Sequence, residues 1–433
     1  MINFPKFGDG ICLARVDQLL SELNIDRDRL AARSIVVTGS NGKGSTSAFC
    51  ESIARSYGMN TGLFTSPHLY EFSERFRIKG MPVGDGALRR ALEKVTAATE
   101  AGEQQGFGAF EILFAVACTL FVESDCDLMI FEAGIGGRYD PVRSVRSRVT
   151  AVTSIDLEHT SLLGSSLELI VLDKTDACAI GGTVIYGENC LTLAKLITSY
   201  LANKGVSARF VGREISSHGV TYSVDTQVFE IEFANLHINV STRLRGLYQI
   251  NNLLIAAALF HQWLLNERQF RESDFVKAVQ DGALHASWPG RLETISDNPH
   301  VIIDVGHTPD GINQTIRSLD ELYPSAEWLA VVGVSEDKDI SKIAQQMAFR
   351  FDRFLCTRAY HKGANPRILS EEIARVNPSA EILLRDDLTE AVHSALQIAR
   401  SGSLSIVVMG GLFLAAEFAV AFRGGDPKAL SFF

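Results

Sequence analysis

Residues 34–46 have the sequence SIVVTGSNGKGST, which changes from an apolar run into a glycine-rich turn. The β-branched run at 34–38 predicts a buried strand, because such side chains favour pleated structure. Helical spacing follows at Ser47–Tyr57, with Phe49 and Ile53 on one side. A strand that leads through a glycine turn into a helix is the repeating unit of α/β proteins with parallel sheets. We therefore expect an α/β fold.

The turn also has the composition of a phosphate-binding loop. Glycines let several backbone N–H groups point at one phosphate, and the following helix N-terminus adds a positive dipole end. Lys43 can reach β- and γ-phosphate oxygens, and a hydroxyl after it can bind Mg²⁺. The strict pattern G-x-x-x-x-G-K-[ST] is not met, since Val37 and Gly44 depart from it; the alternative is a turn that only caps a helix. The candidate nucleotide-binding residues are Gly39, Asn41, Gly42, Lys43, Gly44, Ser45 and Thr46.

The alternation of apolar strands with helical segments continues along the chain and predicts mainly parallel sheet. Between about 205 and 245 apolar and polar residues alternate, which predicts antiparallel strands at the edge of the first domain. After Trp288–Arg291 the strand–helix rhythm restarts, so we expect two domains, at 1–290 and 291–433. The other predicted strands are Leu128–Glu132, Arg148–Ile155, Val301–Val305, Trp328–Val332, Arg353–Cys356 and Ser405–Met409.

Charge and composition narrow the classes of partner. The 433 residues carry a net charge of -10, so most of the surface repels nucleic acid and anionic membranes. The seven cysteines contain no C-x-x-C pair, which predicts free thiols in a reducing compartment. The start, MINFPKFGDG, lacks the apolar core of a signal peptide, and no apolar run approaches the ~18 residues of a membrane span. We expect a cytoplasmic monomer without nucleic-acid or membrane partners.

The glycine turn resembles the G-[ST]-N-G-K-G-[ST] loop of folylpolyglutamate synthases and dihydrofolate synthases, which belong to the Mur ligase superfamily. Other segments resemble that family's motifs in the same order. The resemblance implies a P-loop ATPase domain of the Mur ligase type and a smaller, Rossmann-like C-terminal α/β domain. The matching segments are Thr65–Leu69, Phe110–Glu111, Glu132–Asp140, Thr153–Thr160, Lys174, Gly246–Asn252, Trp288–Arg291, Asp304–Pro309, Gly333 with Asp337–Asp339, and Gly410–Phe413.

Glu132 is the centre of a candidate metal site. It ends an apolar strand, where open α/β sheets bind ligands, and a carboxylate there can hold Mg²⁺ against ATP phosphates. Taken singly, a strand-end Glu, a lone His or a helical Lys is more often structural or solvated. The resemblance implies two Mg²⁺ positions, with K⁺ as an additional candidate cofactor. The implied ligands are Ser45 and Glu132 for one ion, and Ser66, Glu132, His159 and a carbamylated Lys174 for the other.

The resemblance also implies nucleotide contacts near and beyond the domain boundary, at Asn252, Arg291, Asp304 and His307. Arg291 suits this role because a guanidinium can hold oxyanions bidentately. Asp304 ends a predicted strand and could contact ribose or adenine. For Asn252 the structural alternative is a helix N-cap, a position that asparagine favours.

The activity implied by the resemblance is an ATP-dependent ligase that joins a carboxylic acid to an amine through an acyl phosphate. Lys43, His159 and Lys174 would be catalytic. ATP phosphorylates the acid, and the amine then displaces phosphate, a reaction that depends on charge neutralisation at the transferring phosphoryl group. The implied substrates are a folate or dihydropteroate and L-glutamate.

Several positions depart from the family pattern. Arg143 replaces the asparagine of G-G-R-x-D-A-T-N, and we expect it on the substrate side of the cleft, although a solvated arginine is the alternative. Because of these departures, one alternative is a ligase with the same chemistry whose acid substrate is a specialised metabolite and not a folate. A P-loop nucleotide-binding regulator without ligase activity is a second alternative. The other departures are Pro141, Thr175, Asp176, Tyr248, Gly306 and Thr308, together with Cys12–Val16, which fits the family's G-L-E-R-I only loosely.

Overall fold

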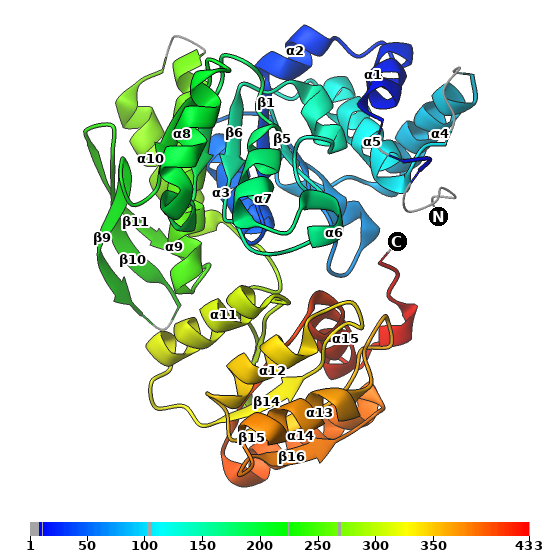
Figure 1. Ribbon diagram of the computed structural model, residues 1–433, viewed down its shortest axis with the longest axis vertical. Coiled ribbons are helices and arrows are strands. Elements are labelled where there is room, and N and C mark those ends of the chain that lie inside the picture. Colours follow the sequence, from blue (N-terminus) through cyan, green and yellow to red (C-terminus); the bar gives the residue numbers. More distant parts are fainter. Residues whose placement is uncertain (1–7, 11, 102–105, 224, 267–269, 433) are drawn as a thin grey trace.

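The computed structural model describes residues 8–10, 12–101, 106–223, 225–266 and 270–432. Figure 1 shows two bodies, one coloured from blue to green and one from yellow to red. Most of the segment MINFPKFGDG lies outside the described residues. Within the described ranges, no helix is long and apolar enough to cross a bilayer. The seven cysteines are free thiols, as their spacing predicted.

The first body is built on a mainly parallel sheet with the strand order β4-β3-β2-β5-β1-β6-β7-β8. Its antiparallel part is at one edge, where β3 pairs with both β2 and β4. All residues of β1 and β5 are buried, as expected for central strands with helices on both faces. The strands are β1 (Ser34–Thr38), β2 (Thr61–Phe64), β3 (Phe76–Ile78), β4 (Met81–Pro82), β5 (Leu128–Glu132), β6 (Val149–Val152), β7 (Thr183–Tyr186) and β8 (Ser207–Phe210).

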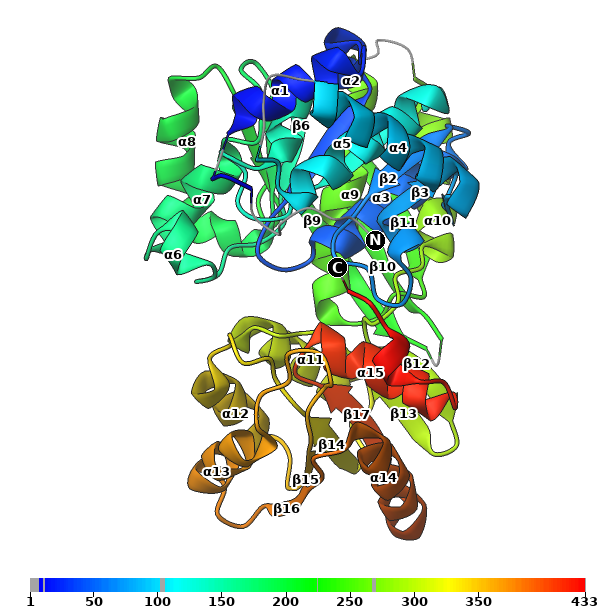
Figure 2. The same ribbon diagram turned by 90° about the vertical axis from the view of Figure 1, so that its right-hand side faces the viewer.

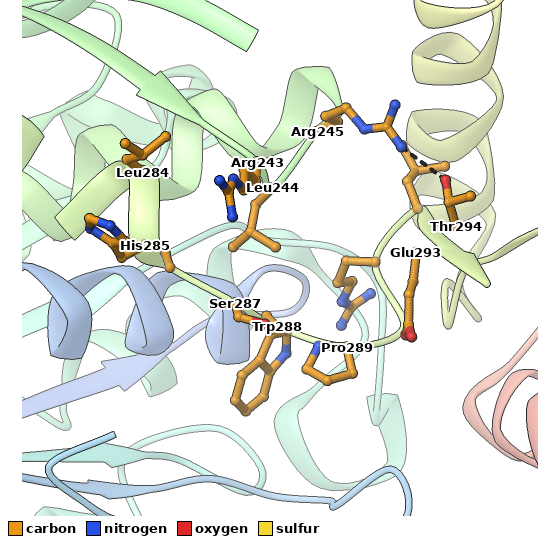
Figure 3. A pocket seen from close by; sticks show the side chains of 13 residues that line it. Arg243, Leu244, Arg245, Leu284, His285, Ser287, Trp288, Pro289, Glu293 and Thr294 are labelled. Atoms are coloured by element: carbon orange, nitrogen blue, oxygen red, sulfur yellow. Dashed lines mark hydrogen bonds between the residues drawn. The ribbon is translucent and has the colours of Figure 1, made fainter. Parts of the chain in front are cut away.

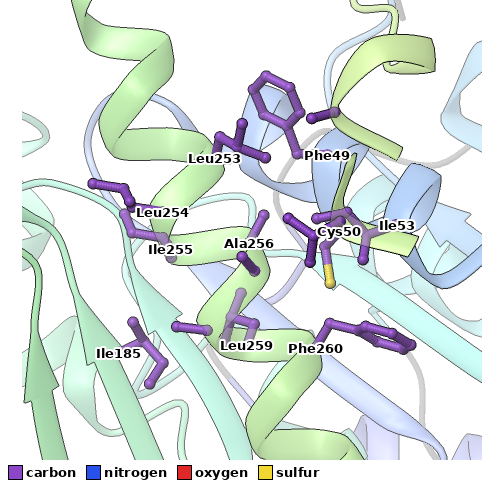
Figure 4. Packing of buried hydrophobic residues seen from close by; sticks show 14 of the residues in the cluster. Phe49, Cys50, Ile53, Ile185, Leu253, Leu254, Ile255, Ala256, Leu259 and Phe260 are labelled. Atoms are coloured by element: carbon purple, nitrogen blue, oxygen red, sulfur yellow. The ribbon is translucent and has the colours of Figure 1, made fainter. Parts of the chain in front are cut away.

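Alternate residues of the central strands enter two different cores. Ile35 of β1 packs in the core that contains α3, α9 and α10, whereas Val36 packs on the other face with α1, α4 and α5. Figure 4 shows the first core, where Phe49 and Ile53 of α3 lie beside side chains of α9. The helices are α1 (Leu13–Glu22), α2 (Arg27–Ala32), α3 (Lys43–Ser56), α4 (Asp85–Ala101), α5 (Ala109–Glu123), α6 (Thr160–Leu163), α7 (Leu167–Thr175), α8 (Ala194–Ala202), α9 (Leu247–Asn266) and α10 (Glu272–His285), with 3₁₀ turns η1 (Phe72–Arg75), η2 (Pro141–Val145) and η3 (Glu188–Leu193).

Helix α10 approaches α3 so closely that a glycine is required between them. A Cβ atom on Gly282 would lie 2.5 Å from the Cα atom of Ile53, which is a backbone atom and cannot rotate away. The hydroxyl of Ser52 donates a hydrogen bond to the Gly282 carbonyl at 2.8 Å, which fixes the same approach. This contact holds α3, and with it the glycine-rich turn, in place.

We expect Gly282→Ala to lower the free energy of unfolding by about 1–3 kcal/mol, because overpacking outweighs the better helix propensity of alanine. Urea denaturation measures the change. Gly86→Ala in α4 is the matched control, since its nearest neighbour, an Arg90 side-chain nitrogen, is 3.5 Å from the added Cβ. Equal stability of the two variants would contradict the close approach.

The alternating segment after residue 205 forms a separate antiparallel sheet, β11-β10-β9. The predicted antiparallel pairing is confirmed, but β9–β11 are not strands of the main sheet. Their apolar side chains, including Phe229 and Ile231, pack instead in the core shared with α9 and α10. Figure 1 shows this sheet beside α9 and α10. The strands are β9 (Ile215–Tyr222), β10 (Gln227–Phe233) and β11 (Leu236–Thr242).

The second body has the strand order β12-β13-β17-β14-β15-β16, parallel except for the β12–β13 pair. The predicted strands at 328–332, 353–356 and 405–409 are confirmed, and the one at 301–305 is shifted by one or two residues. Its elements are β12 (Glu293–Asp297), β13 (His300–Ile303), β14 (Trp328–Val332), β15 (Arg353–Cys356), β16 (Glu381–Leu384), β17 (Ser405–Met409), α11 (Pro309–Leu322), α12 (Ile340–Ala348), α13 (Pro366–Val376), α14 (Leu388–Gly402), α15 (Leu412–Phe422) and η4 (Pro427–Ala429).

Candidate active site

The glycine-rich turn forms a tight loop between β1 and α3. Gly42 is the N-cap of α3 and has φ +87°, in the left-handed region that favours glycine. A Cβ on Gly39 would lie 1.9 Å from the Thr153 hydroxyl oxygen, so only glycine fits there. The Lys43 ammonium donates hydrogen bonds to the carbonyl oxygens of Gly39, at 2.8 Å, and Ser40, at 3.2 Å. The loop thus presents a lysine and a helix N-terminus together, as an anion site requires.

The hydroxyls that follow the loop are buried against α9. Gln249 donates a hydrogen bond to the Ser45 hydroxyl at 3.3 Å, and the Thr46 hydroxyl donates to the Asn252 side-chain oxygen at 3.4 Å. Asn252 in turn donates to Gln249 at 2.9 Å. Because α9 begins at Leu247, Asn252 lies inside the helix, and the alternative that it is an N-cap is wrong. Its contact with the nucleotide stays a prediction.

Glu132 lies at the C-terminal end of β5, next to the strand that leads into the loop. It accepts a hydrogen bond from the Ser66 backbone N–H at 3.2 Å, and Arg75 donates to the Ser66 hydroxyl at 2.9 Å. Burial raises the pKa of the Glu132 carboxyl to about 7, although the Lys43 ammonium acts in the opposite direction. The structure therefore brings two of the predicted metal ligands, Glu132 and Ser66, into contact.

Lys174 is buried on α7, with its side chain 1% exposed, and its ammonium forms an ion pair with Glu158 at 2.9 Å. Burial alone raises the pKa of Glu158, but the Lys174 ammonium lowers it to about 2. His159 follows Glu158 directly and is the exposed N-cap residue of α6, with φ 45°. Glu158 is therefore a site residue that the sequence analysis missed. The available signal was its position beside the candidate ligand His159.

The predicted metal positions fit these residues unequally. Among the described residues, no group of three or more His, Cys, Asp or Glu is arranged to hold a metal ion. One Mg²⁺ fits nevertheless, because Mg²⁺ keeps several waters and needs only one or two carboxylates besides phosphate; the buried Glu132 provides one. The second predicted Mg²⁺ position does not fit its predicted ligands in their unmodified form, because the Lys174 ammonium is itself a cation. Only carbamylation would turn Lys174 into an oxygen ligand.

Asp304, expected to contact ribose or adenine, is held by the protein itself. Asp304 is buried, so a nucleotide could bind it only through carboxylate lone pairs that the protein leaves free. Both of its carboxylate oxygens already accept hydrogen bonds from the protein. These bonds join the interdomain linker (residues 286–292), α9 and the start of the second body. The donors are the Tyr248 hydroxyl at 3.0 Å, the Leu292 N–H at 3.0 Å, the Gly306 N–H at 2.8 Å and the Thr315 hydroxyl at 2.9 Å.

We expect Asp304→Asn to lower the free energy of unfolding by about 2–4 kcal/mol. The NH₂ group of the asparagine would point at O–H and N–H groups that now donate to a carboxylate oxygen, and those donors would lose their acceptor. Urea denaturation measures the loss. Asp297→Asn, an exposed change at the end of β12, is the control. Unchanged stability together with weaker ATP binding would instead support a direct nucleotide contact at Asp304.

Arg291 and His307 lie where the two bodies meet. The Nε atom of Arg291 is buried and has no hydrogen-bond partner among the described residues. Burial lowers the pKa of His307 to about 4, and the nearby Lys338 ammonium adds to that effect. The pKa of His159 is also lowered, because neighbouring protein partly displaces water around its otherwise exposed ring and the Lys338 charge adds to this effect. The charge of Lys338 in the second body therefore acts on both His307 and His159.

The last described residues of the chain return to the first body. The His68 ring nitrogen Nε2 lies 2.6 Å from the Ser431 carbonyl oxygen, and Arg75 donates a hydrogen bond to the Phe432 carbonyl at 3.1 Å. Phe432 is only 2% exposed. Arg75 thus contacts both this tail and Ser66 of the candidate site. Neither contact has a local sequence signal, because the partners of the tail are more than 350 positions away.

A cleft of about 70 Å³ lies between the bodies, beside Glu132 and the loop. Both bodies and the linker contribute to it, which is the usual place for a ligand site in a two-domain enzyme. Its lining residues are Gly44, Thr65, Ser66, Pro67, His68, Leu69, Glu74, Arg77, Glu132, Trp288, Pro289, Arg291, Val305 and Leu412.

Comparison with known proteins agrees with this geometry. Residues 290–412 match the family described as Mur ligase, glutamate ligase domain. The chain is 30% identical over 434 residues to the folylpolyglutamate synthase of Lacticaseibacillus casei, and the match covers 98% of this chain and 97% of that protein. The chain belongs to the folylpolyglutamate synthase family. The resemblance that the ordered motifs indicated is confirmed.

Solved structures of this family have the same fold. Escherichia coli FolC in complex with DHPP and ADP is 25% identical, with a TM-score of 0.83 over 98% of this chain and 95% of that one. Mycobacterium tuberculosis folylpolyglutamate synthase with ADP is 22% identical, with a TM-score of 0.88 over 98% and 96%. The predicted α/β class, with a parallel-rich sheet and a C-terminal α/β domain, is confirmed.

Two departures from the family pattern are joined in space. Arg143 is half-buried and donates a hydrogen bond to the Arg138 carbonyl at 2.8 Å, and the Arg138 side chain forms an ion pair with Asp176 at 2.7 Å. Asp176 also pairs with Lys204. The residues at positions 143 and 176 therefore both contact Arg138. The position of Arg143 on the substrate side of the cleft stays a prediction.

Proposed function

We propose that this chain is an ATP-dependent ligase that joins L-glutamate to the carboxyl group of a folate or dihydropteroate. The observation that carries the proposal is the pairing of the phosphate loop with Glu132 at one end of an interdomain cleft. The full-length match to a folylpolyglutamate synthase supports the acid and the amine. The E. coli relative in complex with DHPP and ADP supports a pterin-like acid beside a nucleotide.

In the proposed reaction the substrate carboxylate attacks the γ-phosphorus of ATP, which breaks the bond to ADP and forms an acyl phosphate. The glutamate amine then attacks the acyl carbon, loses a proton, and expels inorganic phosphate. The γ-phosphoryl oxygens gain negative charge during transfer, so fixed cations lower the barrier. Lys43 and Arg291 are the cationic side chains that we assign to these oxygens.

We assign Glu132 and Ser45 to the Mg²⁺ that accompanies ATP. When bound, such an ion would neutralise phosphate charge. Glu132 also lies in the wall of the cleft with Ser66, so the acid and the nucleotide would meet beside it. His307 and Lys338 would approach from the second body, and closure of the two bodies would exclude water, which otherwise hydrolyses an acyl phosphate.

The test is ADP release with a panel of acids and amino acids, combined with mass spectrometry of the products. We expect ADP release only when both an acid and L-glutamate are present, and a product heavier by one glutamyl residue. Turnover with dihydropteroate, a reduced folate or both would define the acid. Turnover of a non-folate acid alone would change the substrate but keep the chemistry. ADP release that needs neither substrate would refute the ligase and favour a nucleotide-binding regulator.

A further inference from the structure

A second and larger cavity, of about 370 Å³, lies on the other side of the interdomain linker. Figure 3 shows Arg243 and Arg245, which follow β11, on one side of it and Ser287, Trp288 and Pro289 of the linker on the other. The end of α10 closes a third side. The predicted nucleotide-binding residues in the loop are absent from its lining. Apart from Arg291, the lining of the cavity is therefore separate from the residues assigned to ATP.

The charge of this cavity is positive. Arg243, Arg245 and Arg291 line it, and Glu293 is the acidic residue in the lining. The Glu293 carboxylate is already engaged, since it accepts a hydrogen bond from the Gly290 N–H at 2.7 Å and also faces Arg423 at 3.4 Å. In a chain with a net charge of -10, three arginines at one cavity are a local reversal of sign that attracts anions.

The arginines are held in different ways. Arg245 donates a hydrogen bond to the Thr294 hydroxyl at 3.0 Å, and its guanidinium lies 5.7 Å from the ring centre of Tyr323. Arg291 has its buried Nε without a partner among the described residues. Arg243 is exposed. One arginine is thus positioned by the protein, while the other two retain donors for a ligand.

This cavity adjoins the candidate active site. Trp288, Pro289 and Arg291 line both the cavity and the cleft beside Glu132. Trp288 is fixed between its neighbours, because the Arg77 guanidinium lies 5.0 Å from its ring centre and a Cβ on Gly44 would lie 2.7 Å from its ring. A long ligand whose reacting end lies in the cleft can therefore extend past the linker into the cavity.

We propose that the cavity binds carboxylates of the γ-glutamyl tail on the acyl substrate, so that substrates with several glutamyl units are held by Arg243, beside the positioned Arg245. The proposal rests on the proposed function, which lengthens such a tail by one glutamyl unit in each turnover on a folate. Each γ-linked unit leaves one α-carboxylate free, and a guanidinium binds a carboxylate with two parallel charge-assisted hydrogen bonds. A substrate with one glutamyl unit is too short to use the cavity and the cleft together.

The first test compares kinetics of pteroyl substrates with one and with three glutamyl units. Arg243→Gln keeps hydrogen-bonding capacity but removes the charge at an exposed position, so it should fold normally. We expect it to raise KM for the triglutamyl substrate at least fivefold, with kcat and the monoglutamyl KM unchanged. Arg400→Gln, an exposed change in α14, is the matched control. Equal effects on both substrates, or none, would overturn the proposal.

A second measurement separates a substrate tail from a free polycarboxylate that binds the same arginines. Free tri-γ-glutamate should inhibit competitively against the triglutamyl substrate and leave turnover of the monoglutamyl substrate unchanged. A change in monoglutamyl turnover would identify the cavity as an effector site and overturn the tail assignment.

Calorimetric binding of tri-γ-glutamate keeps the inference separate from the proposed function. If the wild-type chain turns over neither pteroyl substrate, the proposed function fails. Binding that weakens at least fivefold in Arg243→Gln would still support the anion site, and a wild-type chain that does not bind tri-γ-glutamate would refute it. If turnover is normal but Arg243→Gln has no effect, the inference alone fails.

Discussion

Replacement of Lys43 by alanine is expected to lower kcat for the ATP-dependent ligation by about 10²–10³-fold, the usual effect of removing one donor from a transition state that gains charge. Lys43 is the cation of the phosphate loop and stands at the first position of α3. Its ammonium is held by the carbonyl oxygens of Gly39 and Ser40, so it is already placed at the mouth of the loop. Steady-state ADP release with saturating substrates measures the loss.

The Lys43 variant must be shown to fold. Circular dichroism and the thermal midpoint should remain close to those of the parent chain, since the lost hydrogen bonds lie within one half-buried loop. Lys195→Ala, an exposed change in α8, is the control for loss of a positive charge. Wild-type turnover of a purified Lys43→Ala variant would remove the phosphate-loop assignment.

Replacement of Lys174 by alanine is expected to reduce turnover to about 1% or less of the parent value. The effect is comparable to that of removing a residue that orients the ligands of a metal ion. We propose that Lys174 is carbamylated in the active enzyme, because its position in the family motif is that of a carbamylated lysine. The Lys174 ammonium first loses a proton, its neutral nitrogen then forms a bond to the carbon of CO₂, and loss of a second proton leaves an anionic carbamate whose oxygens can bind a metal ion. Acetate or formate should then partly restore the Lys174→Ala activity by filling the vacated space.

Loss of Lys174 also leaves Glu158 buried without its partner, which can cost about 3–5 kcal/mol of stability. The double variant Lys174→Ala, Glu158→Gln removes that unpaired charge. We expect it to recover stability in urea denaturation but not turnover. If the double variant recovers both, the pair is structural only. An unmodified Lys174 in mass spectra of active, bicarbonate-equilibrated enzyme would refute carbamylation.

The sequence was most informative where one local pattern determines the structure. The strands at β1, β5 and β17 have the predicted bounds, because a short continuous apolar run between turn signals can be buried on both faces only as a central strand. The loop at 39–46 was recognised from its local pattern, and the positive φ angles of Gly39 and Gly42 explain the glycines there. The close approach of Thr153 to Gly39 was not visible in the local sequence.

The site was less predictable wherever a contact joins distant segments. Nothing near Asp304 indicates that Tyr248 and Leu292 donate to it, so its role in holding the linker was not predicted, and its contact with the nucleotide stays a prediction. The pairing of Lys174 with Glu158 was missed for a related reason. A buried charge needs a partner, but the sequence does not say which of several nearby acids the packing will bring to it.

The contacts of Ser431 and Phe432 with His68 and Arg75 have a mechanical consequence. The chain already joins the two bodies once, at Trp288–Arg291, and the tail joins them a second time. The hydrogen bond from Tyr248 of α9 to Asp304 is a further attachment between them. A swing of the second body away from the phosphate loop must therefore stretch or break at least one of these attachments.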